Sequence, residues 1–169
     1  MFGDLEKSRF IAYSAAFIAL ITLGSWVSIP FFPVPLTLQT LFVLLAGVIM
    51  KRSAVVPVGF YVLLGALGVP VFHNGIAGIG ILLGPTGGFL IGFIVAALVT
   101  GLAYESQSCF IRVLGIMAGT VVIYGFGIAW LMISAGMNFV PAVLAGAVPF
   151  IPGDAIKAGA AYTIGKRFS

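Results

Sequence analysis

Charged residues are scarce in this chain. They make up 7% of its 169 residues, whereas hydrophobic residues make up 62%. A soluble domain carries about 25% charged residues, because its surface must be solvated by water. Eight basic and four acidic side chains could not cover a water-soluble globule of this size. A lipid bilayer removes that requirement, so we predict an integral membrane protein with one compact domain spanning residues 1–169.

Cysteine and histidine are almost missing as well, which excludes several kinds of site. Cys109 is the only cysteine, so no disulfide can form within the chain, and no Cys or His pair has metal-binding spacing. The sequence also lacks a G-x-S-x-G motif and a complete phosphate-binding loop. We therefore expect neither enzymatic activity nor a metal or cofactor. The basic residues lie singly or in pairs, which argues against binding to nucleic acid.

Long apolar runs, in contrast, are abundant. A helix needs about 20 mostly apolar residues to cross the hydrocarbon core of a bilayer. The runs are continuous and lack the period-two alternation that is typical of a membrane β-barrel. We predict an all-α integral membrane protein with six transmembrane helices. The predicted spans are residues 10–29, 36–50, 53–72, 87–104, 113–134 and 152–168.

The basic residues indicate how these helices cross the membrane. With six spans, seven of the eight basic residues fall on one side, and the positive-inside rule assigns that side to the cytoplasm. Both termini are then cytoplasmic, in a multi-pass protein of the cell (plasma) membrane. An odd number of spans would break this agreement. The seven residues are Lys7, Arg9, Lys51, Arg52, Arg112, Lys166 and Arg167.

Three connections on the opposite side contain no charged residue. Residues 30–35, 73–86 and 135–151 are instead rich in Gly, Pro and amides. Their backbone cannot lie bare in lipid, because unpaired N–H and C=O groups are costly there. It must lie among the lipid headgroups, pack on the helices or line a cavity. We therefore expect any solute site at this outer end.

One acidic and one basic residue at the outer end form the clearest candidate site. Asp154 and Lys157 are three residues apart, so they share one face of the last predicted helix. Ionisable groups at membrane depth usually face the protein interior or water. The pair supplies both an acceptor and donors for a polar solute. Alternatively, Asp154 is the N-cap of the helix and the ion pair only holds the helix in place.

Further polar candidates lie near the same end. Thr37 and Gln39 begin the second predicted span, where an amide side chain suits a urea or amide group of a ligand. They would equally well form hydrogen bonds between helices. In the longest outer connection, Asn74 offers an amide, and Gly84, followed by Thr86, allows close approach of the backbone. The alternative there is a turn with Asn-Gly chemistry.

Small residues follow one side of the first predicted span. Ala12, Ala15, Ala16 and Ala19 form two overlapping pairs with a spacing of four residues. Small residues let membrane helices approach one another closely. This face is therefore expected to pack inside the bundle or against a partner subunit.

Four segments of the sequence resemble the BioY family, and together they run over nearly the whole chain. The PVPLTLQT, GPTGG and PFIPGD-x-x-K portions are specific in combination. The segments are PVPLTLQTLFVLLAG (33–47), GALGVPVF (65–72), LLGPTGGFLIGF (82–93) and VPFIPGDAIKA (148–158).

The resemblance implies a six-helix substrate-capture (S) component of an energy-coupling-factor (ECF) transporter, which binds biotin at its outer face. A transmembrane T component and two ATP-binding-cassette subunits would then supply the energy. Asp154 and Lys157 match the family's acidic and basic pair that contacts biotin, and Asn74 falls where its ligand-binding amide is expected. The alanine face of the first span matches the family's surface for the T component, through Ala12 with Ala16 or Ala15 with Ala19.

Two other functions are compatible with the residues alone. A self-sufficient secondary transporter or small channel would use Asp154 as its coupling carboxylate. A purely structural subunit of a larger membrane complex is the third reading. Genes for an ATP-binding-cassette pair beside this one would favour the S component, whereas proton-dependent uptake by the isolated protein would favour the secondary transporter.

Overall fold

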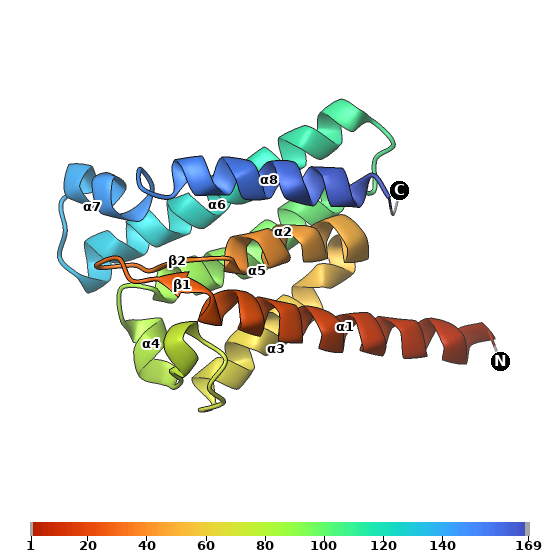
Figure 1. Cartoon of the computed structure of the whole chain (residues 1–169), viewed down its shortest axis with the longest axis horizontal. Helices are drawn as coiled ribbons and strands as arrows, with labels where there is room; N and C mark the ends of the chain where they lie inside the picture. The colour runs from red at the N-terminus through yellow and green to blue at the C-terminus, as the bar shows by residue number, and fades with distance from the viewer. Residues whose placement is uncertain (1, 168–169) are drawn as a thin grey trace.

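The protein is built almost entirely from helices (Figure 1). The computed structural model describes residues 2–167, with side chains from Asp4 onward. The longer helices are α1 (Phe2–Trp26), α2 (Gln39–Met50), α3 (Val55–Ala66), α5 (Gly87–Ala103), α6 (Cys109–Ser134) and α8 (Ile151–Gly165). The shorter elements are the strands β1 (Ser28–Ile29) and β2 (Leu36–Thr37), the 3-10 helices η1 (Lys51–Ala54) and η2 (His73–Gly75), and the helices α4 (Ile79–Leu83) and α7 (Phe139–Gly146).

Several of these helices are long and apolar enough to cross a membrane. By length and composition the candidate spans are Asp4–Trp26, Gln39–Ala66 and Cys109–Ser134. The pair α7 and α8, bent by 51°, is a fourth if it forms one broken span. Large hydrophobic side chains such as Phe110 cover much of the outer surface of the described helices, as contact with lipid requires. The prediction of a helical membrane protein is confirmed at this level.

Several predicted boundaries are wrong. Helix α1 begins at Phe2, so the charged residues near the N-terminus belong to the helix. Helix α3 ends at Ala66 instead of residue 72, because the chain leaves the helix at Gly68, where φ is +102°. The outer connection 135–151 contains the short helix α7. Residue 168, the predicted end of the last span, lies outside the described residues.

Helix α5 lies at the centre of the bundle, packed mainly against α6 and α2. Two glycines on α5 make this close packing possible. A Cβ at Gly88 would collide with the Trp130 side chain on α6, and a Cβ at Gly101 would collide with the backbone of Lys51. Lys51 has φ of +55° and separates α2 from α3. Gly101 therefore lets the junction between α2 and α3 pack directly against α5.

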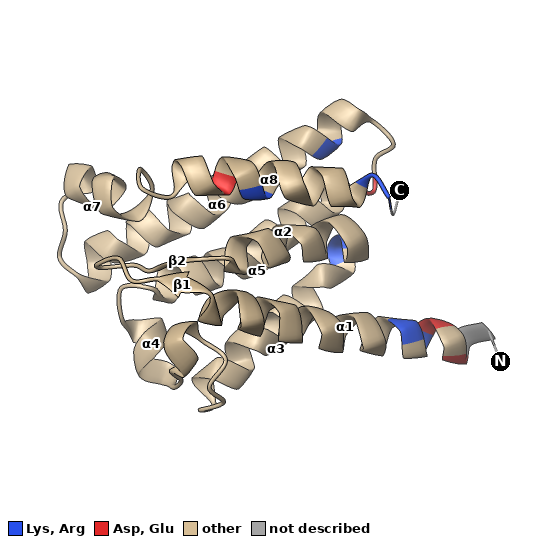
Figure 2. Cartoon of the chain, viewed as in Figure 1, with Lys and Arg blue, Asp and Glu red and all other residues tan. Residues whose placement is uncertain are grey.

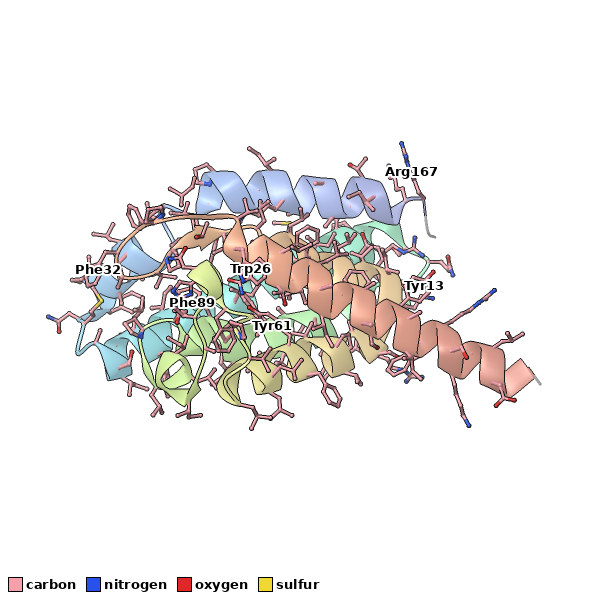
Figure 3. All side chains as sticks on the ribbon, turned by 60° about the horizontal axis from the view of Figure 1, so that its bottom comes forward. Tyr13, Trp26, Phe32, Tyr61, Phe89 and Arg167 are labelled. Carbon is pink, nitrogen blue, oxygen red and sulfur yellow. The ribbon has the colours of Figure 1, made fainter. Side chains whose placement is uncertain are left out.

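The charged residues gather at one end of the molecule, where α1 begins and α8 ends (Figure 2). The hairpin of β1 and β2, together with α4 and α7, lies at the other end (Figure 1). Phe32 in the hairpin and Arg167 after α8 mark these opposite ends (Figure 3). The three charge-free connections thus lie together, away from the basic residues. Asp154 and Lys157 are the exception, since they lie within α8 and away from the charged end (Figure 2).

Candidate solute-binding site

A small cavity lies between the hairpin of β1 and β2 and the first turns of α2, α5 and α8. Its volume is about 40 Å³. Among the described residues that line it, only Asp154 and Lys157 carry a formal charge at neutral pH, and most of the others are apolar or aromatic. The lining residues are Val34, Pro35, Thr37, Gln39, Thr40, Phe72, His73, Thr86, Phe89, Leu90, Phe93, Ile123, Tyr124, Phe150, Asp154 and Lys157.

The carboxylate of Asp154 is the polar centre of this cavity. Asp154 is only 2% exposed. Its Oδ1 atom accepts hydrogen bonds from Lys157 Nζ at 2.8 Å and from Thr40 Oγ1 at 2.9 Å, and its Oδ2 atom accepts one from Tyr124 Oη at 2.7 Å. These donors come from α8, α2 and α6, so the carboxylate joins three helices. Both carboxylate oxygens therefore have hydrogen-bond partners, as a buried polar group requires.

The ammonium of Lys157 is equally well surrounded. Its side chain is 13% exposed. Besides the contact with Asp154, Nζ donates to the carbonyl oxygen of Thr37 at 2.6 Å and to Thr40 Oγ1 at 3.1 Å. An ammonium has three donors, and each of them has an acceptor here. A polar ligand must therefore replace one of these contacts or share an acceptor with the pair.

The amide of Gln39 is anchored through a chain of buried hydrogen bonds. Gln39 Nε2 donates to Tyr61 Oη at 2.6 Å, and Tyr61 Oη donates to the carbonyl oxygen of Val71 at 3.0 Å. Ser25 Oγ donates to the same carbonyl at 2.7 Å, while Thr37 Oγ1 donates to Gln39 Oε1 at 3.0 Å. Tyr61 points into the bundle in Figure 3. This chain fixes the orientation of the Gln39 side chain at the edge of the cavity.

Aromatic rings form much of the remaining wall. Phe89 and Phe150 face each other with ring centroids 6.3 Å apart, and Phe72 packs edge-on against Tyr61 at 5.7 Å. Figure 3 shows Phe89 directed into the bundle from α5. Such rings provide flat apolar surface, which suits a ligand with an apolar body and a few polar groups.

The structure brings together five of the seven candidate residues for substrate binding. Thr37, Gln39, Thr86, Asp154 and Lys157 all line the cavity. Thr86 lies at the start of α5, where its hydroxyl donates a long 3.4 Å hydrogen bond to the carbonyl of Ile81. The interpretation of Asp154 as the N-cap of its helix is wrong, because α8 begins at Ile151. Asp154 lies inside the first turn, where its side chain points to the cavity.

The other two candidates lie outside the cavity lining. Asn74 has left-handed backbone geometry, with φ of +55°, and its Oδ1 atom accepts a hydrogen bond from Ser28 Oγ at 2.9 Å. Gly84 offers its carbonyl oxygen to the indole N–H of Trp130 at 2.9 Å. In this conformation both residues hold connections of the outer end in place. The four alanines of α1 all lie on its exposed side.

Sequence reasoning did not single out Tyr124 or the phenylalanines of the wall. Tyr124 is one of few polar side chains in the long apolar run of α6, and a polar side chain in such a run indicates a residue that faces the protein interior. The phenylalanines carry no such signal, because the chain has 15 of them. His73 also lines the cavity, and burial lowers the pKa of this histidine below its ordinary value. No cluster of His, Cys, Asp or Glu that could hold a metal occurs within residues 2–167.

Comparisons with known proteins identify the family of this chain. The family described as BioY matches residues 3–169. A biotin transporter BioY of Thermotoga maritima is 42% identical over 161 residues, which cover 94% of this chain and 95% of that protein. A probable biotin transporter BioY of Pyrococcus horikoshii is 39% identical over 162 residues, covering 95% of this chain and 96% of that protein. The crystal structure of the S component for biotin from an ECF-type ABC transporter has a TM-score of 0.87 and 28% identity, over 96% of this chain and 91% of that one.

Proposed function

This chain belongs to the BioY family, and on that premise we propose that it is the biotin-binding S component of an ECF transporter. It captures biotin at the extracellular face and passes it to an ATP-driven coupling module. The observation that carries this proposal is the buried pair of Asp154 and Lys157 in an otherwise mainly apolar, aromatic cavity at the charge-free end. The family match supplies the identity of the ligand.

The chemistry of the cavity fits biotin well. Biotin has a ureido ring with two N–H donors and a carbonyl acceptor, an apolar thioether ring and a carboxylate tail. Asp154 can accept from the ureido N–H groups, while Lys157 and the amide of Gln39 can donate to an oxygen of the ligand. The rings of Phe89 and Phe150 cover the apolar part. Asn74 and Gly84 would contact biotin only after a shift of the outer connections.

The cavity must widen to admit biotin. Pockets for small ligands typically enclose about 300–1,000 Å³, whereas this cavity encloses about 40 Å³. Val34 and Pro35 line it from the hairpin of β1 and β2, whose strands pair with each other through two residue pairs. Such a short hairpin is marginally stable on its own. We therefore propose that the hairpin moves outward when biotin enters.

We further propose that the chain forms a single domain with six membrane-spanning helices. It would lie in the plasma membrane, with both termini in the cytoplasm. The grouping of the basic residues at one end supports this orientation (Figure 2). The spans would be α1, α2, α3, α5, α6 and α8, with the stretch Gln39–Ala66 divided at Lys51 into α2 and α3. With 12 residues each, α2 and α3 reach about 18 Å, less than the about 30 Å of the hydrocarbon core. The packed connections at the outer end would fill the difference.

The coupling module would supply both the energy and the inward release of biotin. We propose a T component in the membrane and two ATP-binding-cassette subunits as its parts, with biotin as cargo and no cofactor on this chain. The exposed alanine face of α1, formed by Ala12, Ala15, Ala16 and Ala19, supports a contact with the T component. Lipid covers the rest of the apolar surface.

Titration of the purified protein with biotin tests the capture function. We expect saturable binding of one biotin per chain, weaker binding of biotin amide and no binding of an unrelated vitamin. Asp154→Asn and Lys157→Ala should weaken binding. The control Lys7→Ala, which like Lys157→Ala removes one positive charge but from the exposed part of α1, should not. Uptake of biotin by the chain alone, driven by a proton gradient and lost in Asp154→Asn, would instead favour a secondary transporter.

A further inference from the structure

A second cavity lies at the charged end of the molecule, far from the candidate biotin site. It encloses about 320 Å³ between the end of α5, the start of α6 and the end of α8. Six residues line it, and unlike the walls of the first cavity they are all polar, cationic or sulfur-containing. They are Tyr104, Gln107, Cys109, Arg112, Tyr162 and Lys166.

The charge of this cavity is positive. Arg112 and Lys166 lie in its wall, and neither takes part in the ion pairs found among the described residues. The guanidinium of Arg112 lies 5.5 Å from the ring centroid of Tyr104, and Lys166 Nζ lies 4.8 Å from that of Tyr162. Arg112 uses Nε for the carbonyl of Ser106 at 2.8 Å and has a long 3.4 Å contact from Nη2 to Gln107. Most donors of the two cations therefore remain available.

A buried hydroxyl in the same wall lacks a partner. Tyr104 is only 3% exposed, and its Oη atom has no hydrogen bond within the described part of the chain. A buried hydroxyl without a partner is unfavourable, and a bound water or ion is one way to satisfy it. Across the cavity, Tyr162 Oη lies 2.8 Å from Cys109 Sγ. The hydroxyl oxygen of Tyr104 has almost no accessible surface, so a ligand in the cavity reaches it only when the side chain turns toward the cavity.

Helix α6 adds a third favourable element. It is 26 residues long and begins at Cys109, which lines the cavity, and the N-cap residue Ser108 makes no side-chain capping bond. The free N–H groups and the positive end of a helix dipole favour an anion. Large apolar side chains stand beside this helix start, and Phe110 is 70% exposed. An anion bound here would have acyl-chain contacts within reach.

We propose that this cavity binds a phosphate group, held by the two cations and the start of α6 and, once the Tyr104 side chain turns toward it, by the hydroxyl of that residue. An acidic phospholipid headgroup of the neighbouring leaflet and a free phosphate ion share this chemistry. In a purely structural reading, Arg112 reaches from the first turn of α6 to the carboxyl end of α5 and Lys166 lies at the carboxyl end of α8, where cations stabilise the helix dipole. That reading gives no role to the unpartnered hydroxyl.

The test uses the delipidated full-length protein in a neutral detergent. Thermal unfolding is measured with phosphatidylglycerol, with phosphatidylcholine and with inorganic phosphate, in titrations that yield apparent affinities. We expect saturable stabilisation by phosphatidylglycerol, with a weaker effect of phosphatidylcholine. The variant Arg112→Gln/Lys166→Gln should weaken this affinity at least about tenfold. The matched control Lys7→Gln/Arg9→Gln, which removes two charges from the same end, should keep it.

The variant Tyr104→Phe separates the proposal from the structural reading. If a phosphate accepts from the hydroxyl, Tyr104→Phe weakens the affinity several-fold while biotin binding stays normal. Saturable stabilisation by inorganic phosphate alone would support the site with a soluble ligand. Equal stabilisation of wild type, Arg112→Gln/Lys166→Gln and Tyr104→Phe by phosphatidylglycerol would overturn the proposal, as would no stabilisation by any phosphate compound.

Discussion

For Asp154→Asn the structure predicts effects on both stability and biotin binding. It removes the charge of a carboxylate that is 2% exposed and accepts hydrogen bonds from Lys157, Thr40 and Tyr124. Lys157 then keeps its buried charge without a counterion. Removing one member of a buried ion pair costs about 3–5 kcal/mol. Because Thr37 and Thr40 still accept from Lys157, we expect a loss of unfolding free energy near the lower end, about 3 kcal/mol.

The effect on biotin should be separable from this loss of stability. A lost charge-assisted hydrogen bond costs about 1.5–3 kcal/mol, which corresponds to about 10- to 100-fold in affinity. In Asp154→Asn/Lys157→Met no buried charge remains, so its unfolding free energy should exceed the value expected from adding the two single losses. Its affinity for biotin should nevertheless stay low, because neither the acceptor charge nor the ammonium is present.

The wild type, Asp154→Asn, Lys157→Met and the double variant are compared by thermal unfolding without biotin and by calorimetric titration with biotin. The key comparison is the double variant, in which stability should exceed the additive expectation while the affinity for biotin should stay low. If the double variant binds biotin as tightly as the wild type, the pair serves only to hold α8 in place. If the two stability losses simply add, the ion pair contributes no coupling energy and our account of the cavity fails.

Three further predictions test other parts of the protein. In a Cys109→Ser background, Gln107→Cys should be shielded from an impermeant thiol reagent in intact cells and Asn138→Cys should react; the reverse pattern refutes the proposed orientation. Ala16→Trp should leave biotin binding nearly intact but abolish ATP-driven uptake, because the ring holds the T component away; loss of binding as well would make Ala16 an internal packing residue. Since burial lowers the pKa of His73, the unfolded chain binds more protons, so stability should fall as the pH drops below about 6.5. Thermal unfolding should lose this dependence in His73→Gln, and an unchanged pH profile would contradict it.

Much of the fold follows from the sequence because the bilayer imposes simple rules. The apolar runs and the alternating basic residues predict where helices lie and which ends come together. The end of α3 was missed because residues 67–72 are as apolar as the helix before them, although Gly68 followed by Pro70 is a common signal for the end of a helix. What ends the helix is the backbone of Gly68, whose positive φ is invisible in a hydropathy pattern.

Some residues of the candidate site could likewise be predicted from the sequence and others could not. Asp154 and Lys157 were predictable, because two charges three residues apart in an apolar segment must share a surface. Tyr124 was not, because its contact with Asp154 depends on how α6 and α8 pack together. Asn74 was predicted to reach a ligand, but its left-handed backbone turns the side chain toward Ser28. Pairings between distant segments are set by packing, and local spacing does not reveal them.

The hydrogen-bond chain through Tyr61 links two surfaces that serve different purposes. Ser25, near the end of α1, and Tyr61 both donate to the carbonyl of Val71, and the next residue, Phe72, forms part of the cavity wall. Helix α1 also carries the alanine face proposed to meet the T component. A shift of α1 along its axis would therefore either move Phe72 as well or break the hydrogen bond between Ser25 Oγ and the carbonyl of Val71. These hydrogen bonds thus connect the inner side of α1, whose outer face is the proposed surface for the T component, with the wall of the proposed biotin cavity.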